Sequence, residues 1–222
     1  MDLSNNPLLQ KLELWNTSLN SLDVRKNPNL QELICTGGSI SVLDFSQNLY
    51  LRSLNVGNNN LTALDVSHCT WLYDLSCGGN AITSLDLTKN YKLKYLMCGN
   101  NQLSKIDLTK NPELTWLDIS DNIRITEIDV TQNFRLEQLR VRDLSLSELD
   151  VSKNLELSIL SCMSNQLSIL DISQNTKLTS LDCLRNPMLS EILVWPGFNV
   201  NDPKASIKQF FVKSGTTLTV KH

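Results

Sequence analysis

The stretch KLKYLMCGNNQLSKIDLTKNP, residues 92–112, places Cys98, Asn101 and Asp107 at fixed offsets from two leucines. The same offsets recur along nearly the whole chain. The leading leucine of the pattern LxxLxCxxNxLTxLDVSxN recurs at Leu9, Leu30, Leu51, Leu72, Leu93, Leu114, Leu136, Leu157 and Leu178. The step is 21 residues, except for one step of 22. Sustained self-similarity at this period indicates stacked coils that share one continuous core.

Each copy contains two segments whose apolar residues point to one side. The LxxLxC segment, at the start of each copy, is the first. In the second segment, Leu64 and Val66 face inward and Asp65, between them, faces outward. This alternation is typical of short strands. Two extended segments and two corners leave no room for a helix in 21 residues. We therefore expect a mainly β, right-handed solenoid of about nine coils, with parallel strands on a concave face and short extended or β segments on the convex face.

Composition narrows the classes of function. The chain has 222 residues and a formal net charge of −3, so it offers no basic stripe for a phosphate backbone, and we expect no nucleic-acid partner. The longest apolar run, ILVW at 192–195, is far too short for a membrane span. The repeat is already under way at residue 2. We expect an N-terminal cap, and any signal or anchor, to lie outside this fragment.

One position of the repeat holds cysteine in some copies and an aliphatic residue in others. It is occupied by Leu14, Cys35, Val56, Cys77, Cys98, Ile119, Val141, Cys162 and Cys183. This exchange is typical of a small buried hydrophobe with a free thiol, and not of a metal ligand, so we expect neither a metal nor a cofactor. A disulfide within Cys77/Cys98 or Cys162/Cys183 is the alternative.

Two asparagine rows mark the two corners of the coil. The first contains Asn59, Asn80, Asn101, Asn122, Asn165 and Asn186, and the second contains Asn6, Asn27, Asn48, Asn90, Asn111, Asn133, Asn154 and Asn175. Cys69 interrupts the second row. A corner leaves backbone donors and acceptors inside the coil, and a carboxamide can pair with both kinds. We interpret both rows as structural.

An aspartate row runs along the second segment of the coils. Its members are Asp2, Asp23, Asp44, Asp65, Asp86, Asp107, Asp129, Asp150 and Asp171. Clustered carboxylates can bind calcium, but LDVS supplies few of the further oxygen ligands that calcium needs. The alternative, which we favour, is that each carboxylate accepts hydrogen bonds within its own turn.

The consensus LxxLxCxxNxLTxLDVSxN resembles the 21-residue leucine-rich repeats of internalins with a cysteine ladder and of Bacteroidetes-type surface proteins. The resemblance covers about residues 2–194. It implies a secreted or cell-surface bacterial protein, often lipid-anchored, that takes part in adhesion or protein binding and carries no catalytic residues. One copy, LEQLRVRDLSLSE at 136–148, lacks both the cysteine and the asparagine.

The repeat ends after Trp195, so we divide the chain into a solenoid at 1–199 and a C-terminal cap at 200–222. In the cap, Asn201 or Asp202 before Pro203 is a helix start signal. Ile207, Phe210 and Phe211 then follow at helical spacing, Gly215 can end the helix, and TTLTVK alternates like a strand.

The candidate binding residues are the variable positions of the LxxLxC strands, which face solvent. Large apolar, aromatic and arginine side chains gather in the central and later copies, and such residues are enriched at binding hot spots. They are Tyr73, Tyr95, Met97, Trp116, Asp118, Gln138, Arg140, Arg142, Ile159 and Met163. We expect Trp71 to pack elsewhere, at a back corner beside Tyr50 and Tyr91.

Three functions fit these residues. The first is a non-enzymatic interaction module that binds a protein on its concave face. The second is a carbohydrate-binding surface in which sugar rings stack on Tyr95 and Trp116. The third is a structural spacer for another domain. An enzyme is disfavoured, because the chain has two histidines and no nucleophile motif.

Overall fold

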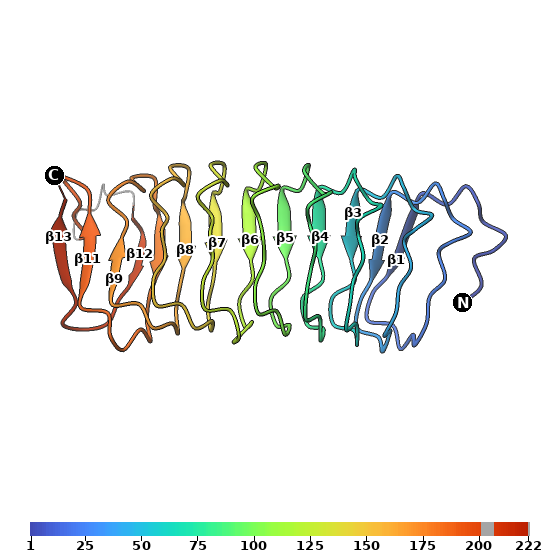
Figure 1. Ribbon diagram of the computed structural model, residues 1–222, viewed down its shortest axis with the longest axis horizontal. Coiled ribbons are helices and arrows are strands. Elements are labelled where there is room, and N and C mark those ends of the chain that lie inside the picture. Colours follow the sequence, from blue (N-terminus) through green and yellow to red (C-terminus); the bar gives the residue numbers. More distant parts are fainter. Residues whose placement is uncertain (201–206, 222) are drawn as a thin grey trace.

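The computed structural model describes residues 1–200 and 207–221, and it shows the predicted solenoid of stacked coils (Figure 1). The coils follow one another along the long axis of the molecule, with the two chain ends at opposite ends of the stack (Figure 1). The described residues form strands, turns and extended segments but no helix, as expected for the repeats.

One side of the stack is a ten-stranded parallel sheet. Its strands, in order, are β1 (Lys11–Leu14), β2 (Glu32–Cys35), β3 (Ser53–Asn55), β4 (Asp74–Ser76), β5 (Tyr95–Met97), β6 (Trp116–Asp118), β7 (Gln138–Arg140), β8 (Ile159–Ser161), β10 (Ser180–Asp182) and β12 (Gln209–Phe211). The second leucine of LxxLxC lies in register from coil to coil, as Leu96 with Leu75 and Leu117. These leucines are fully buried, and their strand neighbours point outward.

The second segment of each coil forms the other side of the stack. Near the C-terminus it becomes a three-stranded parallel sheet of β9 (Ile169–Asp171), β11 (Glu191–Val194) and β13 (Thr217–Val220). In the earlier coils of the described chain the same segment is extended without forming strands. Both outcomes agree with the expected short extended or β segments.

The tail differs from its prediction. The predicted helix is wrong at its C-terminal half, because β12 occupies Gln209–Phe211 and pairs with β10, while its first part, residues 201–206, lies outside the described residues. Gly215 takes a positive φ of 85° in a turn rather than ending a helix. The predicted strand is confirmed as β13, which pairs with β11. The described tail therefore adds one strand to each sheet.

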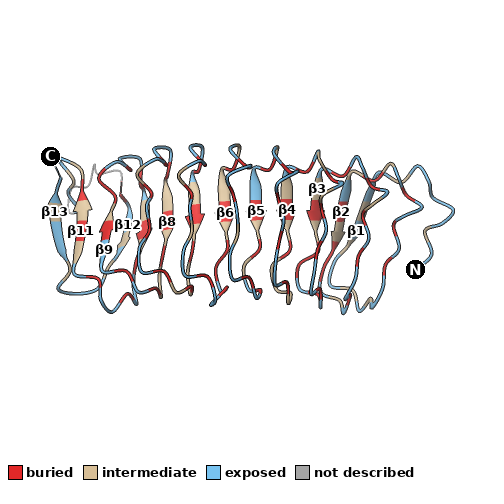
Figure 2. Ribbon diagram, in the orientation of Figure 1, coloured by how far each residue is buried: buried red, intermediate tan, exposed pale blue. Residues whose placement is uncertain are grey.

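The buried residues form one core cluster, mostly of leucine, isoleucine, valine and cysteine, together with Phe45. Buried segments recur in the coils along the stack (Figure 2). All six cysteines are buried and free, which confirms the free-thiol interpretation over the disulfide alternative. Burial raises the pKa of the Cys77 thiol to about 12, because the charged thiolate is poorly solvated there. The thiols therefore serve as small apolar side chains.

Both asparagine rows hold neighbouring coils together. Asn101 donates from Nδ2 to the Cys77 and Cys98 carbonyls at 3.1 and 3.0 Å, and its Oδ1 accepts the backbone N–H of Ile82 at 3.0 Å. In the second row, Asn111 donates to the carbonyls of Leu87 and Asn90. The structural interpretation of both rows is confirmed.

A third row occupies the turn after each LxxLxC strand, where the backbone adopts the left-handed region. One residue per coil does so: Asn16, Gly37, Asn58, Gly79, Asn100, Asp121, Asp143, Ser164 and Arg185. Glycine, asparagine and aspartate tolerate this conformation best, which explains the residue types in the first seven coils. This turn directs the chain from the sheet into the asparagine corner.

Candidate functional site

The outward face of the ten-stranded sheet brings most of the predicted binding residues together. Tyr95, Trp116, Gln138 and Ile159 are in register on adjacent strands and form one row across the sheet. Met97, Asp118 and Arg140 form a second row, two residues further along the same strands. The parallel register sets these rows, because every coil places the same repeat position at the same height.

Two of the predicted residues lie just beyond the strand ends. Arg142 donates its backbone N–H to Ser120 Oγ, and its carbonyl accepts the N–H of Asp121 at 2.9 Å. The carbonyl of Met163 accepts the N–H of Asp143 at 3.0 Å. These contacts place Arg142 and Met163 in a third row beside the second one. We call the three rows together the central face.

Charged and aromatic groups contact one another within the central face. The guanidinium carbon of Arg140 lies 5.2 Å from the centre of the Trp116 ring, within the range of a cation–π interaction. Trp116 is half-buried, and its indole Nε1 is buried without a hydrogen-bond partner. The ring face that the carbohydrate alternative needs is thus partly covered by Arg140, whereas the indole N–H is an unused donor.

At the edge of the central face, Arg142 interacts electrostatically with Asp121 and lies next to Asp143 in the sequence. Burial, and then the neighbouring Asp143 carboxylate, raise the pKa of Asp121, while Arg142 opposes this shift. The Nε of Arg142 is buried and makes no hydrogen bond. This edge of the central face therefore carries a positive guanidinium and negative carboxylates on adjacent coils.

Three successive coils carry glycine in the row that lies just beyond the strand ends. Gly57, Gly78 and Gly99 occupy the row that Ser120 and Arg142 continue. A Cβ at Gly99 would meet the Ser120 carbonyl oxygen at 2.9 Å, so this row lets adjacent coils approach closely. The change from glycine to serine and arginine occurs within the central face, one coil after Tyr95 and Met97.

The structure adds neighbours to the expected position of Trp71, whose partner Lys92 also lies 5.9 Å from the Tyr91 ring. The Trp71 side chain lies beside the sheet, in a pocket with Tyr73 and Tyr95, and Lys92 Nζ is 3.2 Å from the centre of its ring. Trp71 directly precedes the leading leucine of its coil, one repeat before Lys92. Comparing the position before each leading leucine would have placed Trp71 and Lys92 on adjacent coils. Sequence reasoning missed this pocket.

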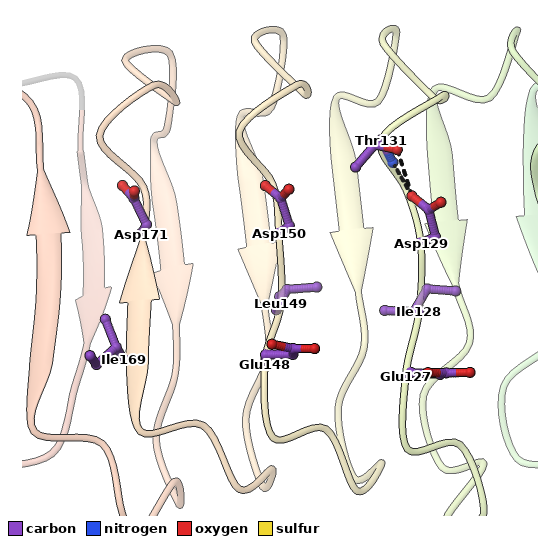
Figure 3. A pocket seen from close by; sticks show the side chains of 9 residues that line it. All are labelled: Glu127, Ile128, Asp129, Thr131, Glu148, Leu149, Asp150, Ile169 and Asp171. Carbon is purple, nitrogen blue, oxygen red and sulfur yellow. Dashed lines mark hydrogen bonds between the residues drawn. The ribbon is translucent and has the colours of Figure 1, made fainter.

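The opposite side of the stack carries a second, acidic pocket of about 510 Å³. Asp129, Asp150 and Asp171 occupy equivalent positions on successive coils, and Glu127 and Glu148 lie at the other end of the same segments (Figure 3). The carboxylates form parallel rows and do not converge on one point (Figure 3). No group of three or more potential ligands that could hold a metal occurs among the described residues.

The hydrogen bonds of the aspartate row follow the turn interpretation. Asp107 Oδ1 accepts the backbone N–H and the hydroxyl of Thr109, at 2.9 and 2.7 Å. These bonds, to the side chain first and to the backbone second, lower the pKa of Asp107. Asp65 accepts the N–H of Ser67 in the same way. The interpretation of the row as turn acceptors is confirmed.

No protein-family model and no curated protein matches the chain. The functional domain of InlJ from Listeria monocytogenes, described as including a cysteine ladder, is 34% identical with a TM-score of 0.71, and the match covers 86% of this chain and 47% of that one. The chain is an internalin-like leucine-rich repeat protein. Its own cysteine row is interrupted by valine and isoleucine.

Two further solved structures share the fold of this leucine-rich repeat protein. Internalin InlF from Listeria monocytogenes is 22% identical with a TM-score of 0.76, and the match covers 86% of this chain and 62% of that one. A leucine-rich repeat protein from Leptospira interrogans is 19% identical with a TM-score of 0.77, over 94% and 57%. The chain thus spans less than two thirds of each of these proteins. Its described residues include no helix with the length and apolarity of a membrane span.

Proposed function

We propose that this internalin-like leucine-rich repeat protein is a non-enzymatic interaction module that binds a protein through the central face of its ten-stranded sheet. Leucine-rich repeat proteins of this kind generally act by binding proteins, and a solenoid presents an extended binding surface. The bacterial internalins that it resembles also favour a secreted or cell-surface location. The proposed partner is a folded protein, since a row of side chains across parallel strands presents a broad, flat surface.

The observation that carries this proposal is the composition of the rows. Tyr95, Trp116 and Ile159 are aligned across the strands, and Arg140 lies against the Trp116 ring. Aromatic residues and arginine are the side chains that contribute most to protein interfaces, whereas β3 and β4 present Ser53, Asn55, Asp74 and Ser76 at the corresponding positions.

Site-specific crosslinking tests this proposal. A photoreactive residue is placed at Gln138 on the central face or, as a control, at Lys153, which is exposed in the turn after the aspartate row. The protein is then exposed to proteins from the surface of candidate host or neighbouring cells. We expect saturable crosslinks to a discrete protein from position 138 and none from position 153.

Charge reversal makes the test quantitative. For the partner so identified, Arg140→Glu should weaken binding at least about 10-fold, because it removes the Trp116 contact and inverts a charge within the face. Lys153→Glu also replaces a positive by a negative side chain, but away from this face, and should leave the affinity for the partner unchanged. Equal losses in the two variants, or crosslinks from position 153 alone, would refute binding through the central face.

A further inference from the structure

A pocket of about 660 Å³ lies at the edge of the ten-stranded sheet, where the chain enters β4 and β5. It is lined by Arg52, Trp71, Tyr73, Lys92, Lys94, Tyr95 and Glu113. Only Tyr73 and Tyr95 belong to the predicted binding residues. We call this site the aromatic–cationic pocket. Its volume is in the range of small-ligand sites.

The stacking of the coils positions the side chains of this pocket. Tyr73 lies between Arg52 and Lys94, because its N–H bonds to the Arg52 carbonyl at 2.9 Å and its own carbonyl accepts the N–H of Lys94 at 2.8 Å. The N–H of Tyr95 also bonds to the Tyr73 carbonyl, at 3.0 Å. Backbone ladders therefore fix Arg52, Tyr73, Lys94 and Tyr95, which pre-organises this part of the pocket for a ligand, whereas Trp71 and Lys92 lie in the turns that precede the strands.

The charges of the pocket are unbalanced. Among the described residues, Arg52, Lys92 and Lys94 form no ion pair, and Lys92 instead lies over the Trp71 ring. The one carboxylate of the pocket, on Glu113, pairs with Arg135 of the next coil. This is a local excess of positive charge on a chain whose net charge is −3. An anionic ligand would complement it.

Three aromatic rings are exposed in the same pocket. Trp71 is 49% exposed, and Tyr73 and Tyr95 are each 39% exposed. Lys92 covers one face of the Trp71 ring, so the apolar surface open to a ligand comes from the rest of this ring and from the two tyrosines. The two tyrosine hydroxyls supply donors and acceptors at the rim.

We propose that the aromatic–cationic pocket binds a carboxylate-bearing saccharide, such as a uronic acid unit of a glycan. The apolar C–H face of a sugar ring packs on exposed aromatic rings, its hydroxyls bond to tyrosine hydroxyls, and its carboxylate lies next to Arg52 and Lys94. An acidic peptide would use the cations but needs no cluster of ring faces. This proposal is independent of protein binding through the central face, although the two sites share Tyr95.

The test measures binding of short oligomers of galacturonate and of hyaluronate by calorimetry and by tryptophan fluorescence. The methyl ester of each oligomer is the matched control, because esterification removes the charge and retains the ring. We expect saturable binding of at least one acid oligomer, with its ester at least about 10-fold weaker. Trp71→Ala and Lys94→Gln should each reduce affinity at least about 10-fold. The matched variants Trp15→Ala and Lys105→Gln, outside the pocket, should not.

Several results would overturn the proposal. No saturable binding of either oligomer, or equal binding of acid and ester, would show that the pocket does not recognise acidic sugars. Tighter binding of a poly-glutamate peptide, lost in both pocket variants, would assign the pocket to an acidic polypeptide. Lys94→Gln changes only an exposed side chain and keeps the test decisive should Trp71→Ala fail to fold. Arg140→Glu should retain saccharide binding, which separates this proposal from the function proposed for the central face.

Discussion

In most coils, a buried asparagine of the second row donates hydrogen bonds to two backbone carbonyls. Asn90 and Asn111 each donate two hydrogen bonds of 2.9–3.1 Å to earlier coils. At Cys69 the row is broken, and the thiol reaches only the Asn48 carbonyl, at 3.9 Å. A thiol is a weak donor, so this corner lacks two amide hydrogen bonds that its neighbours make.

Replacing Cys69 by asparagine should therefore stabilise the protein. The equivalent positions on both sides already hold asparagine, so the side chain fits the corner, and its Nδ2 would meet the carbonyls of Phe45 and Asn48. We expect a gain of less than about 1 kcal/mol, because two net hydrogen bonds of roughly 0.5–1.5 kcal/mol each are offset by the loss of the buried thiol and by a carboxamide Oδ1 that, as at Asn48 and Asn90, has no hydrogen-bond partner. A rise in the urea midpoint would show this.

Asn111→Ala is the opposite change at the next but one coil, and it should lower the urea midpoint. The variant leaves two buried carbonyls unpaired and opens a cavity, which together cost about 2–4 kcal/mol. If Cys69→Asn were neutral while Asn111→Ala destabilised the protein, the corner at Cys69 would be satisfied in some other way. The asparagine row would then not be uniform.

The buried thiols should give the protein a dependence on alkaline pH. Burial raises the pKa values of Cys69 and Cys77 to about 12, from about 9 when exposed. Their contribution to stability is fully present below pH 9 and is lost as the pH rises from 9 toward 12, because only the unfolded chain releases these protons in that window. We expect the urea midpoint to fall from pH 9 to 11.

Cys77→Val provides the control for this pH dependence, since valine occupies the same repeat position at Val56 and Val141. The variant should fold and should lose less stability between pH 9 and 11 than the parent protein. Thiol reagents at pH 8 should modify the native protein slowly and the urea-unfolded protein at once. Fast labelling of the native chain would contradict burial of the thiols.

Strand pairing decides the structure of the tail. Ile207, Phe210 and Phe211 have helical spacing, but the open edge of β10 offers unpaired backbone groups, and β12 pairs with it in parallel. Tertiary pairing here overrides local periodicity, which single-sequence reasoning does not capture. β13 was predictable because its alternation and its pairing with β11 favour the same conformation.

The two phenylalanines of β12 should differ sharply in their contribution to stability. Phe210 is partly buried, with its ring 5.6 Å from Phe198, which in turn lies 4.7 Å from Trp195. Phe211 is 49% exposed. Phe210→Ala should cost about 2–3 kcal/mol and Phe211→Ala less than about 1 kcal/mol, measured by urea unfolding. Equal losses would argue that the last strand does not pack as the structure shows.

At the scale of the whole molecule, the period of 21 residues was sufficient to predict the solenoid, the buried leucines and both asparagine rows. The rows of the central face also followed from the sequence, because identical repeat positions must align. The aromatic–cationic pocket did not follow. Trp71 and Lys92 share a repeat position on adjacent coils, but this position is not part of the consensus. Their cation–π contact depends on the conformations of the two side chains, which the period does not specify.

Each coil pairs only with the coils next to it, so stability should decrease from the middle of the stack toward its ends. The central strands β4 to β7 have partners on both sides, whereas β1, β12 and β13 each have a partner on one side only. In such one-dimensional assemblies the end units open first. We expect backbone amides of residues 93–119 to exchange with deuterium at least about 10-fold more slowly than those of residues 11–14 and 217–220.

Phe210→Ala supplies an internal control for this gradient. The substitution weakens the last coils, so exchange should accelerate in residues 180–200 and stay unchanged at residues 32–56, because the coils between them do not transmit the loss. Exchange at one common rate along the chain, accelerated everywhere by Phe210→Ala, would show that the stack opens as a single cooperative unit. In that case the terminal strands would govern the stability of the central face as well.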